Sequence, residues 1–493
     1  MGCLAPLYGM PLGLLTDLYQ LTMAYGYWKT GMREHRAVFH LFFRKPPFGG
    51  AYALAGGIEA AAEWLDGLRF TPDDLSYLAG LRGNDGRPLF PDAFLSELQE
   101  FRFRGDVDAV REGTAVFAHE PLIRVTASII EAQLLETALL TLVNFGTLIT
   151  TKAARICEAA EGDAVVEFGL RRAQGIDGGV TAARAAYVGG CVGTSNVLAG
   201  RLFGIPVKGT HAHSWVMAFG DEQTAFDRYA EAMPNNAILL VDTYDTVRGV
   251  EHAIATARRL RAGGHRIVGI RLDSGDIAAL SRIAREKLDA AGFHEAVIVA
   301  SGDLDEFRIA EFKRRGARVD VWGVGTRLAV AWDQPALGGV YKLGGIRPPG
   351  QAWSFRMKRS DDPAKTTNPG ILQVRRFGTG GRMLADVLYN EPQHTADWRC
   401  VSPDGSEPPI SLAQAEDHGD LLQPLFRDGQ RVRAPLPIEE IRRFALQQRE
   451  AIPQSVRRIE QPAEFPVMLD QELFRLKTEL LRRIEAAASG GAG

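Results

Sequence analysis

Polar side chains follow six short apolar runs between Ala164 and Thr326, each at the point where the run ends. The runs are short and rich in Val and Ile, which is typical of buried parallel strands. Helix-like stretches separate most of them, which indicates successive strand–helix units. Because active sites in such folds collect at the carboxyl ends of the strands, these side chains are the candidates for chemistry. They include Glu167, Arg171, Arg172, Thr210, His211, His213, Asp242, Thr243, Arg271, Asp273, Ser301 and Asp303.

Two neighbouring strand ends have the composition of phosphate-binding turns, ASGD and WGVGT. Glycine lets backbone amides approach a ligand closely, although a lone GxGT sequence is as readily a tight turn. Two adjacent turns of this kind favour a phosphate site. The residues concerned are Ser301, Gly302, Asp303, Gly323, Gly325 and Thr326.

Carboxylates follow two other runs, in VDTYD and LDSGD. Beside a phosphate site, carboxylates either hold Mg²⁺ or accept hydrogen bonds from ribose hydroxyls. Asp245 and Asp276 lie directly before predicted helices and are equally well explained as N-caps. Asp242 and Asp273 lie farther from those helices, which favours a functional role for them.

The HAH sequence places His211 and His213 two residues apart, and alternate residues of a strand share a face. A metal hydrolase could use such a pair, but the other strand ends supply no further His or Lys ligands. Zinc is therefore disfavoured, and a nucleophilic or general-acid histidine is the better interpretation. A hydrogen-bonded core histidine is the remaining alternative.

Composition limits the partners of this protein. At 493 residues the chain should form two or three domains, and its net charge of −3 gives no sign of a polyanion-binding surface. Its four cysteines are dispersed without a CxxC pair, which argues against a zinc knuckle or a disulfide framework. No leader-like or membrane-spanning run is visible, so we expect a cytoplasmic protein without nucleic-acid or membrane partners.

The pattern along the chain predicts an α/β protein. Residues 1–145 mix helices with alternating strands, 146–334 hold the strand–helix series, and 335–493 return to strands and then helices. Six strand ends are too few for an eight-unit barrel, so we expect an irregular or partial α/β barrel. The terminal segments together should build an α+β sandwich-like domain. Helices of the series are expected at 177–189, 246–261, 277–291 and 306–316.

Local positive charge stands out in this balanced chain. Arg44 and Lys45 lie between two phenylalanines and a Pro-Pro turn. These neighbours should hold Arg44 in position, which favours an anion-binding role for it. Lys342 and the 356–365 loop add further cations, although solvated surface lysines are the default explanation for the loop.

These motifs, in this order, resemble the nicotinate phosphoribosyltransferase family. The resemblance extends over nearly the whole chain and is carried by LLTDLYQLTMAYGYW, EFGLRRAQGIDGG, GIPVKGTHAHSW, VDTYDT, GIRLDSGD, GVGT, GGVYKL and DPAKTTNPG. It implies synthesis of nicotinate mononucleotide and diphosphate from nicotinate and 5-phosphoribosyl 1-diphosphate, with ATP hydrolysed alongside, in NAD salvage. It also implies a type II phosphoribosyltransferase barrel beside a sandwich-like domain, and a homodimer with shared active sites.

The resemblance also implies roles for individual residues. His213 would be the histidine that ATP phosphorylates, because the family places it in an AHS triplet, whereas His211 stands where the family usually has an apolar residue. Nicotinate would be held by Thr210, Arg271 and Tyr19 of the partner subunit. Arg171 lies in a motif that lines the pyridine pocket, and Phe168 and Tyr244 are the aromatic side chains at the strand ends.

The resemblance also implies which residues bind phosphate and metal. The SGD and GVGT turns would take the 5′-phosphate, and Arg44 and Lys45 the diphosphate. Asp242 and Asp273 would face the ribose or Mg²⁺. Three rival hypotheses stay open: a sibling transferase that uses nicotinamide or quinolinate, a barrel metal hydrolase that uses both histidines, and a non-catalytic ligand sensor.

Overall fold

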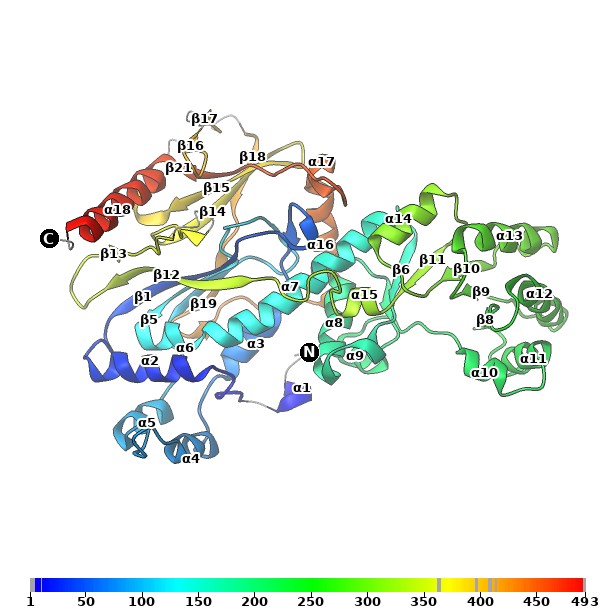
Figure 1. Ribbon diagram of the computed structural model, residues 1–493, viewed down its shortest axis with the longest axis horizontal. Helices are drawn as coiled ribbons and strands as arrows, with labels where there is room; N and C mark the ends of the chain where they lie inside the picture. The colour runs from blue at the N-terminus through cyan, green and yellow to red at the C-terminus, as the bar shows by residue number, and fades with distance from the viewer. Residues whose placement is uncertain are drawn as a thin grey trace. The chain divides into compact units, whose positions relative to one another are not determined.

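The computed structural model describes residues 5–9, 11–360, 365–394, 398–406, 410–412 and 415–490. Part of the basic loop predicted at 356–365 therefore lies outside the described residues. The chain divides into two compact units, one formed by Met1–Leu148 with Ala336–Gly493 and the other by Ile149–Pro335 (Figure 1). In the part of the chain that the structure describes, no helix is long and apolar enough to cross a membrane.

The second unit is built on a six-stranded parallel sheet in the order β7-β6-β11-β10-β9-β8. The first and last strands of the series, β6 and β11, pair side by side, as they do when a barrel begins to close. The strands are β6 (Ala164–Glu167), β7 (Gly193–Thr194), β8 (Ile238–Leu240), β9 (Gly269–Leu272), β10 (Val297–Ala300) and β11 (Val321–Val324).

Helices follow most of these strands, and Figure 1 shows α12 and α13 flanking β8 and β9. The four helices predicted in the series are confirmed, with each end within two residues of its predicted position. The helices of this unit are the C-terminal part of α7 (Glu136–Ala159), then α8 (Gly175–Val188), α9 (Val197–Phe203), α10 (His213–Met217), α11 (Glu222–Ala232), α12 (Thr246–Ala262), α13 (Ile277–Ala290), α14 (Glu306–Arg314) and α15 (Thr326–Ala329).

The strand predicted in IPVKG is wrong, and β7 is the sixth strand instead. Two hydrogen bonds join this run to β7: the Thr194 amide donates to the Pro206 carbonyl at 3.0 Å, and the Lys208 amide donates to the Thr194 carbonyl at 2.9 Å. Only an isolated bridge between Thr194 and Val207 results. Proline has no amide hydrogen to donate, which limits how far a ladder can extend here.

The first unit combines both ends of the chain in one sheet, as predicted for the sandwich-like part. Its seven-stranded sheet has the order β13-β12-β1-β5-β3-β19-β20. N-terminal strands of this sheet are β1 (Arg36–Phe43), β3 (Asp106–Ala109) and β5 (Ile123–Ser128), and C-terminal ones are β12 (Gly339–Arg347), β13 (Ser354–Phe355), β19 (Gln423–Arg427) and β20 (Gln430–Arg431).

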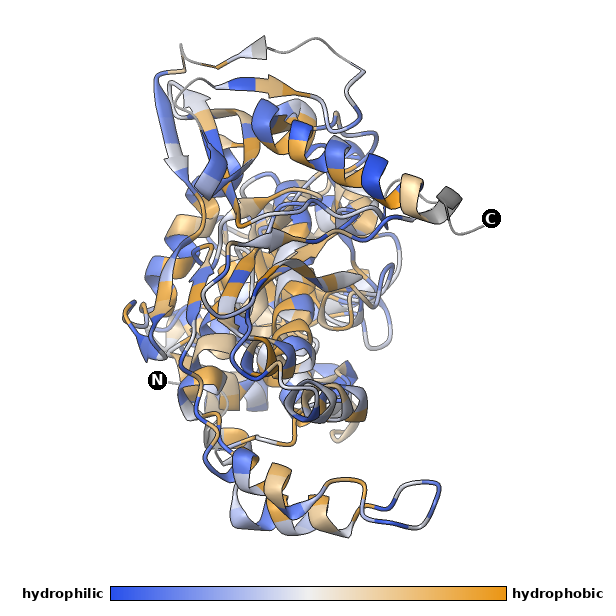
Figure 2. Ribbon diagram, turned by 90° about the vertical axis from the view of Figure 1, so that its left-hand side faces the viewer, coloured by the Kyte–Doolittle hydropathy of each residue, from blue (hydrophilic) through white to orange (hydrophobic). Residues whose placement is uncertain are grey.

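A second, six-stranded sheet of this unit comes entirely from the C-terminal segment, in the order β17-β16-β21-β15-β14-β18. Helix α18 (Gln471–Gly490) carries both hydrophilic and hydrophobic residues over the part coloured in Figure 2, and its buried Leu473 packs against this sheet. The strands are β14 (Leu372–Thr379), β15 (Arg382–Asn390), β16 (Arg399–Val401), β17 (Ile410–Ser411), β18 (Asp417–Asp420) and β21 (Val467–Asp470).

The remaining elements of the first unit are a short ladder of β2 (Ala53–Leu54) with β4 (Ala115–Val116) and several helices. These helices are α1 (Ala5–Tyr8), α2 (Leu18–Lys29), α3 (Ile58–Gly67), α4 (Pro72–Gly80), α5 (Asp92–Gln99), α6 (Ile129–Leu134), the N-terminal part of α7, α16 (Ile438–Ala451) and α17 (Gln454–Arg457).

A buried histidine joins the two sheets of the first unit. His40 of β1 accepts a hydrogen bond at Nε2 from the Leu372 amide of β14, at 3.1 Å. Burial, with the positive charge of Arg124, lowers the pKa of His40 to about 3. The ring is therefore neutral at physiological pH and acts as an acceptor within the fold.

Acid should destabilise the protein through His40. In the unfolded chain the ring protonates near its ordinary pKa of 6.5, whereas in the folded chain it protonates only near 3. The free energy of unfolding should therefore fall as pH falls from about 6.5 to about 3, by about 1.4 kcal/mol per pH unit for one proton. Urea titrations across this range should show a shallower slope for His40→Gln, which keeps an acceptor but cannot be protonated. Equal slopes for the two proteins would rule out this role.

Candidate active site

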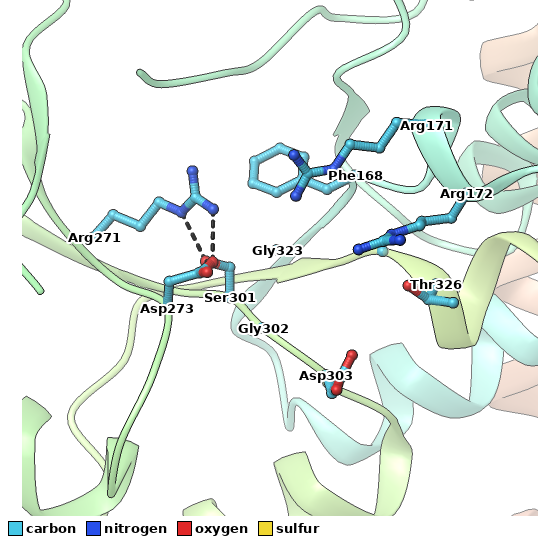
Figure 3. A pocket seen from close by; sticks show the side chains of 11 residues that line it. Phe168, Arg171, Arg172, Arg271, Asp273, Ser301, Gly302, Asp303, Gly323 and Thr326 are labelled. Atoms are coloured by element: carbon cyan, nitrogen blue, oxygen red, sulfur yellow. Dashed lines mark hydrogen bonds and ion pairs between the residues drawn. The ribbon is translucent and has the colours of Figure 1, made fainter. Parts of the chain in front are cut away.

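A pocket of about 290 Å³ lies at the carboxyl ends of the parallel strands in the second unit (Figure 3). It draws on the ends of β6, β9, β10 and β11, as expected for this fold. Its lining residues are Phe168, Arg171, Arg172, Arg271, Asp273, Ser301, Gly302, Asp303, Gly323, Gly325 and Thr326. The structure thus brings both predicted phosphate-binding turns together with Phe168, Arg171, Arg271 and Asp273.

Arg271, on β9, is held by neighbours on three segments. Its Nε donates to Ser301 Oγ at 2.7 Å, and its Nη1 donates to Thr210 Oγ1 at 3.0 Å. Its Nη2 pairs with Asp273 Oδ1 at 2.7 Å (Figure 3). The guanidinium also lies 5.9 Å from the centre of the Phe168 ring. Arg271 is therefore a fixed cation beside an aromatic face.

Asp273 and Asp242 form a connected carboxylate pair. Burial opposes ionisation of Asp273, but hydrogen bonds from Ser301 and Arg271 outweigh it and hold the pKa of the carboxyl below its usual range. Asp242 Oδ2 accepts from the Asp273 amide at 2.8 Å and from Ser274 Oγ at 2.7 Å. Asp242 Oδ1 is buried and has no hydrogen-bond partner among the described residues. An orphaned carboxylate oxygen of this kind suits a hard cation such as Mg²⁺.

The other two aspartates of these motifs cap helices. Asp245 accepts from the Arg248 amide at the start of α12, and Asp276 accepts from the Ala279 amide at the start of α13. This is the alternative that their positions before the helices indicated.

His213 is the first residue of α10 and is exposed enough to react. Its Nδ1 lies 3.2 Å from Thr243 Oγ1, and its Nε2 lies 3.8 Å from Asp273 Oδ2. The side chain keeps 40% of its surface exposed. One ring nitrogen is thus oriented by a hydroxyl, and the other is open beside a carboxylate.

His211 has a different environment, and its role is structural. It is 8% exposed. The Leu240 amide donates to its Nε2 at 3.1 Å, and its Nδ1 lies 3.2 Å from the Ala212 carbonyl. A neutral ring with its proton on Nδ1 satisfies both contacts, and burial lowers the pKa of His211 accordingly.

The expectation that the two histidines share one face is wrong. The segment that carries them is not a strand, because His211 lies in a loop and His213 begins a helix. The ring of His211 instead bonds an amide of β8, which pairs with β9 on its other edge. With both nitrogens engaged, His211 is a poor metal ligand in this arrangement, and the described residues contain no group of three or more His, Cys, Asp or Glu suited to a metal ion.

Two glycines of the pocket are required by close contacts. Gly302 has φ +113°, and a Cβ there would lie 2.6 Å from the Asp273 carbonyl oxygen. A Cβ on Gly323 would lie 2.6 Å from the ring of Phe168. The absence of these side chains lets the SGD turn approach β9 and lets the Phe168 ring lie against β11.

Arg172, in the turn after β6, is one of the strand-end candidates, but the sequence assigned it no specific role. It lines the pocket with Arg171, and neither arginine is paired with a carboxylate among the described residues. Glu167 supports this turn, because its buried carboxylate accepts hydrogen bonds from the Gly169 amide and from Thr194 Oγ1, the latter at 2.6 Å. Burial raises the pKa of Glu167. The doubled arginine in FGLRR was the available signal for Arg172.

Three family models match successive parts of the chain. The nicotinate phosphoribosyltransferase N-terminal domain matches residues 14–144, the nicotinate phosphoribosyltransferase family matches 164–378, and the C-terminal domain matches 373–477. The nicotinate phosphoribosyltransferase of Bacillus subtilis is 41% identical over 494 residues, which cover 96% of each protein. The chain belongs to the nicotinate phosphoribosyltransferase family.

Comparison with the human enzyme supports this assignment. The human nicotinate phosphoribosyltransferase is 36% identical over 528 residues, covering 95% of this chain and 96% of that protein. The crystal structure of human nicotinic acid phosphoribosyltransferase superposes with a TM-score of 0.82 at 32% identity, covering 94% of this chain and 99% of that one. The predicted family and α/β fold are confirmed.

A more distant structure shows the same fold. The nicotinate-nucleotide pyrophosphorylase of Pyrococcus furiosus superposes with a TM-score of 0.67 at 22% identity, covering 89% of this chain. At that identity the likeness concerns the fold alone.

The other predicted site residues of this nicotinate phosphoribosyltransferase family member lie in the first unit. Tyr19 is on α2 and is 47% exposed, and burial of its hydroxyl together with the Glu136 carboxylate raises its pKa. Arg44 and Lys45 follow directly after β1, and Arg44 Nε is buried without a hydrogen-bond partner among the described residues. The roles of these three residues stay predictions.

Proposed function

We propose that this protein transfers the phosphoribosyl group of 5-phosphoribosyl 1-diphosphate to nicotinate, with ATP hydrolysed through a phosphohistidine at His213. The observation that carries the proposal is the pocket, where a fixed arginine beside an aromatic ring adjoins two glycine-containing turns. Its products are nicotinate mononucleotide and diphosphate, which places the reaction in the salvage of nicotinate toward NAD.

Nicotinate has the two features that one side of the pocket suits. Its carboxylate would pair with Arg271, whose Nη1 contact to the His211 carbonyl is long at 3.5 Å and readily exchanged. Thr210 shares that edge of the guanidinium, and the Phe168 ring offers a face for the pyridine ring. An amide cannot reproduce the charged pair, so nicotinamide would leave the arginine poorly satisfied.

We assign the phosphoribosyl donor to the other side of the pocket. The 5′-phosphate would be held by the SGD and GVGT turns, with Arg172 adding a positive charge. The ribose would face Asp273 and Asp242, and Arg44 with Lys45 would bind the diphosphate. Magnesium, if held by Asp242 Oδ1 and Asp273, would supply positive charge to the departing diphosphate.

The bond changes follow from this arrangement. The pyridine nitrogen of nicotinate forms a bond to C1 of the ribose while the bond from C1 to the diphosphate oxygen breaks. Positive charge develops on the ribose, and the Asp273 carboxylate, whose pKa is held below its usual range, would stabilise it. Negative charge leaves with diphosphate, which arginine and lysine side chains would stabilise.

His213 is suited to accept the phosphoryl group of ATP. With its Nδ1 proton directed to Thr243 Oγ1, its Nε2 carries the free electron pair. Attack of Nε2 on the γ-phosphorus releases ADP, and later attack of water on the phosphohistidine releases phosphate. The Asp273 carboxylate, 3.8 Å from Nε2, would stabilise the positive charge that the ring acquires.

One assay panel tests the proposal. Diphosphate release from 5-phosphoribosyl 1-diphosphate should be fast with nicotinate, slow with nicotinamide and quinolinate, and stimulated by ATP. Equal turnover of nicotinate and nicotinamide would contradict the assignment, and faster turnover with quinolinate would favour the sibling transferase.

A homodimer with shared active sites is part of the proposal, with Tyr19 of the partner subunit completing the nicotinate site. Stacking of the pyridine ring on that side chain would help to hold nicotinate. Co-refolding Tyr19→Ala with His213→Asn should restore ATP-coupled activity, because random mixing gives heterodimers with one intact composite site.

The restored activity should reach up to about a quarter of the normal value, given random mixing and two-fold symmetry. Each variant refolded alone is the control. If tagged pull-down shows heterodimers but activity stays at the level of the controls, Tyr19 does not act across an interface.

A further inference from the structure

A fully buried lysine pairs with two carboxylates that follow the predicted phosphate-binding turns in sequence. Lys152 lies on α7 and is 0% exposed, and its Nζ pairs with Glu306 Oε2 at 2.6 Å and with Asp333 Oδ2. Arg155, three residues later on the same helix, donates from Nε to Glu306 Oε1 at 2.9 Å. A buried ammonium is costly unless it is paired, so these carboxylates fix its position and are fixed by it.

Glu306 connects Lys152 to the SGD turn. It is the first residue of α14, three positions after Asp303, and is itself 0% exposed. The turn between them is tied to the same helix, because Arg308 Nη1 donates to the Asp303 carbonyl at 2.8 Å. An anchored Glu306 therefore fixes the helix start and the turn that precedes it.

Asp333 connects Lys152 to the GVGT turn. Its Oδ1 lies 3.8 Å from Nη1 of Arg327, the residue that follows Thr326. The chain reverses between them through Ala331, a non-glycine residue with φ +45°, and the Gln334 amide donates to the Ala331 carbonyl at 2.9 Å. L-residues rarely adopt this backbone conformation, so the surrounding contacts must hold the reversal in place.

We propose that Lys152 is a positioning residue for phosphate binding. Through Glu306 and Asp333 it holds the SGD and GVGT turns at the separation at which one phosphate group can accept hydrogen bonds from both. The role is one of geometry, because Lys152 pairs with Glu306 and Asp333, and none of these three side chains lines the pocket. This inference rests on the proposed function in taking the bound phosphate to be that of a sugar phosphate.

Calorimetric titration of the full chain with ribose 5-phosphate tests the role directly, because it needs no turnover. The Kd should rise at least fivefold in Lys152→Met and in Asp333→Asn. The KM for 5-phosphoribosyl 1-diphosphate should rise in parallel, while the KM for nicotinate stays within about twofold. The matched control is Lys313→Met, which removes another ion-paired lysine at the far end of α14, 2.8 Å from Asp163.

The outcomes separate this role from the proposed function. A lower melting temperature with an unchanged Kd in both variants would show that Lys152 is merely structural and would overturn the inference alone. A parent protein that neither binds ribose 5-phosphate nor releases diphosphate would overturn both. If Lys152→Met does not fold, Asp333→Asn decides the question, because its side chain is 32% exposed and changes little in size.

Discussion

Replacing Arg271 by alanine should lower kcat/KM for nicotinate by about two orders of magnitude or more and raise the apparent KM. The change removes the cation that would pair with the nicotinate carboxylate, and a charged hydrogen-bonded contact is worth about 1.5–3 kcal/mol in this setting. It also frees Asp273 and Ser301 from the contacts that orient them, which are 2.7 Å long in each case. Steady-state kinetics with nicotinate as the varied substrate measures the loss.

Two further variants show whether the effect comes from the geometry of Arg271. Arg271→Lys keeps the charge but not the planar fork, so it should recover only part of the activity. Arg315→Ala removes an exposed arginine that pairs with Asp276 at 2.5 Å, and it should leave kcat/KM unchanged. A folded Arg271→Ala protein with nearly normal kcat/KM would show that nicotinate binds elsewhere.

His213→Asn should abolish the acid-labile phosphoryl label from γ-labelled ATP and nicotinate-dependent ATP hydrolysis, while weak phosphoribosyl transfer continues. The reason is that Nε2 of His213 is the open ring nitrogen beside Asp273, and asparagine offers no nucleophile there. The substitution removes the phosphoryl acceptor that would couple ATP hydrolysis to phosphoribosyl transfer, and it should leave the pocket itself intact. Peptide mapping of the labelled parent protein identifies the modified residue.

His211→Asn is the matched control, because its ring nitrogens are engaged by the Leu240 amide and the Ala212 carbonyl. This variant should lose stability but keep the label. A buried amide left without an acceptor costs about 1–3 kcal/mol, which thermal unfolding can detect. Label found on His211 of the parent protein would show that the two histidines have been assigned in the wrong order.

The sequence by itself determined which strands form the pocket and to which family the protein belongs. Runs of Val and Ile that end in polar residues mark β6, β8, β9, β10 and β11, because a buried parallel strand needs an apolar core and ends where solvent begins. The same local pattern identified both glycine-containing turns and separated the capping aspartates Asp245 and Asp276 from Asp242 and Asp273.

Only the tertiary structure decided the strand pairing, the environments of the two histidines and the partners of Lys152. The residues of IPVKG read as a strand, but pairing depends on the neighbouring chain, and β7 took that place in the sheet. The two histidines of HAH are equivalent in the sequence pattern. In the structure, His211 accepts a hydrogen bond from a backbone amide of β8, whereas the His213 side chain remains partly exposed. Lys152 gave no signal in a long helix, because its partners lie 154 and 181 positions away in sequence and only folding brings those charges together.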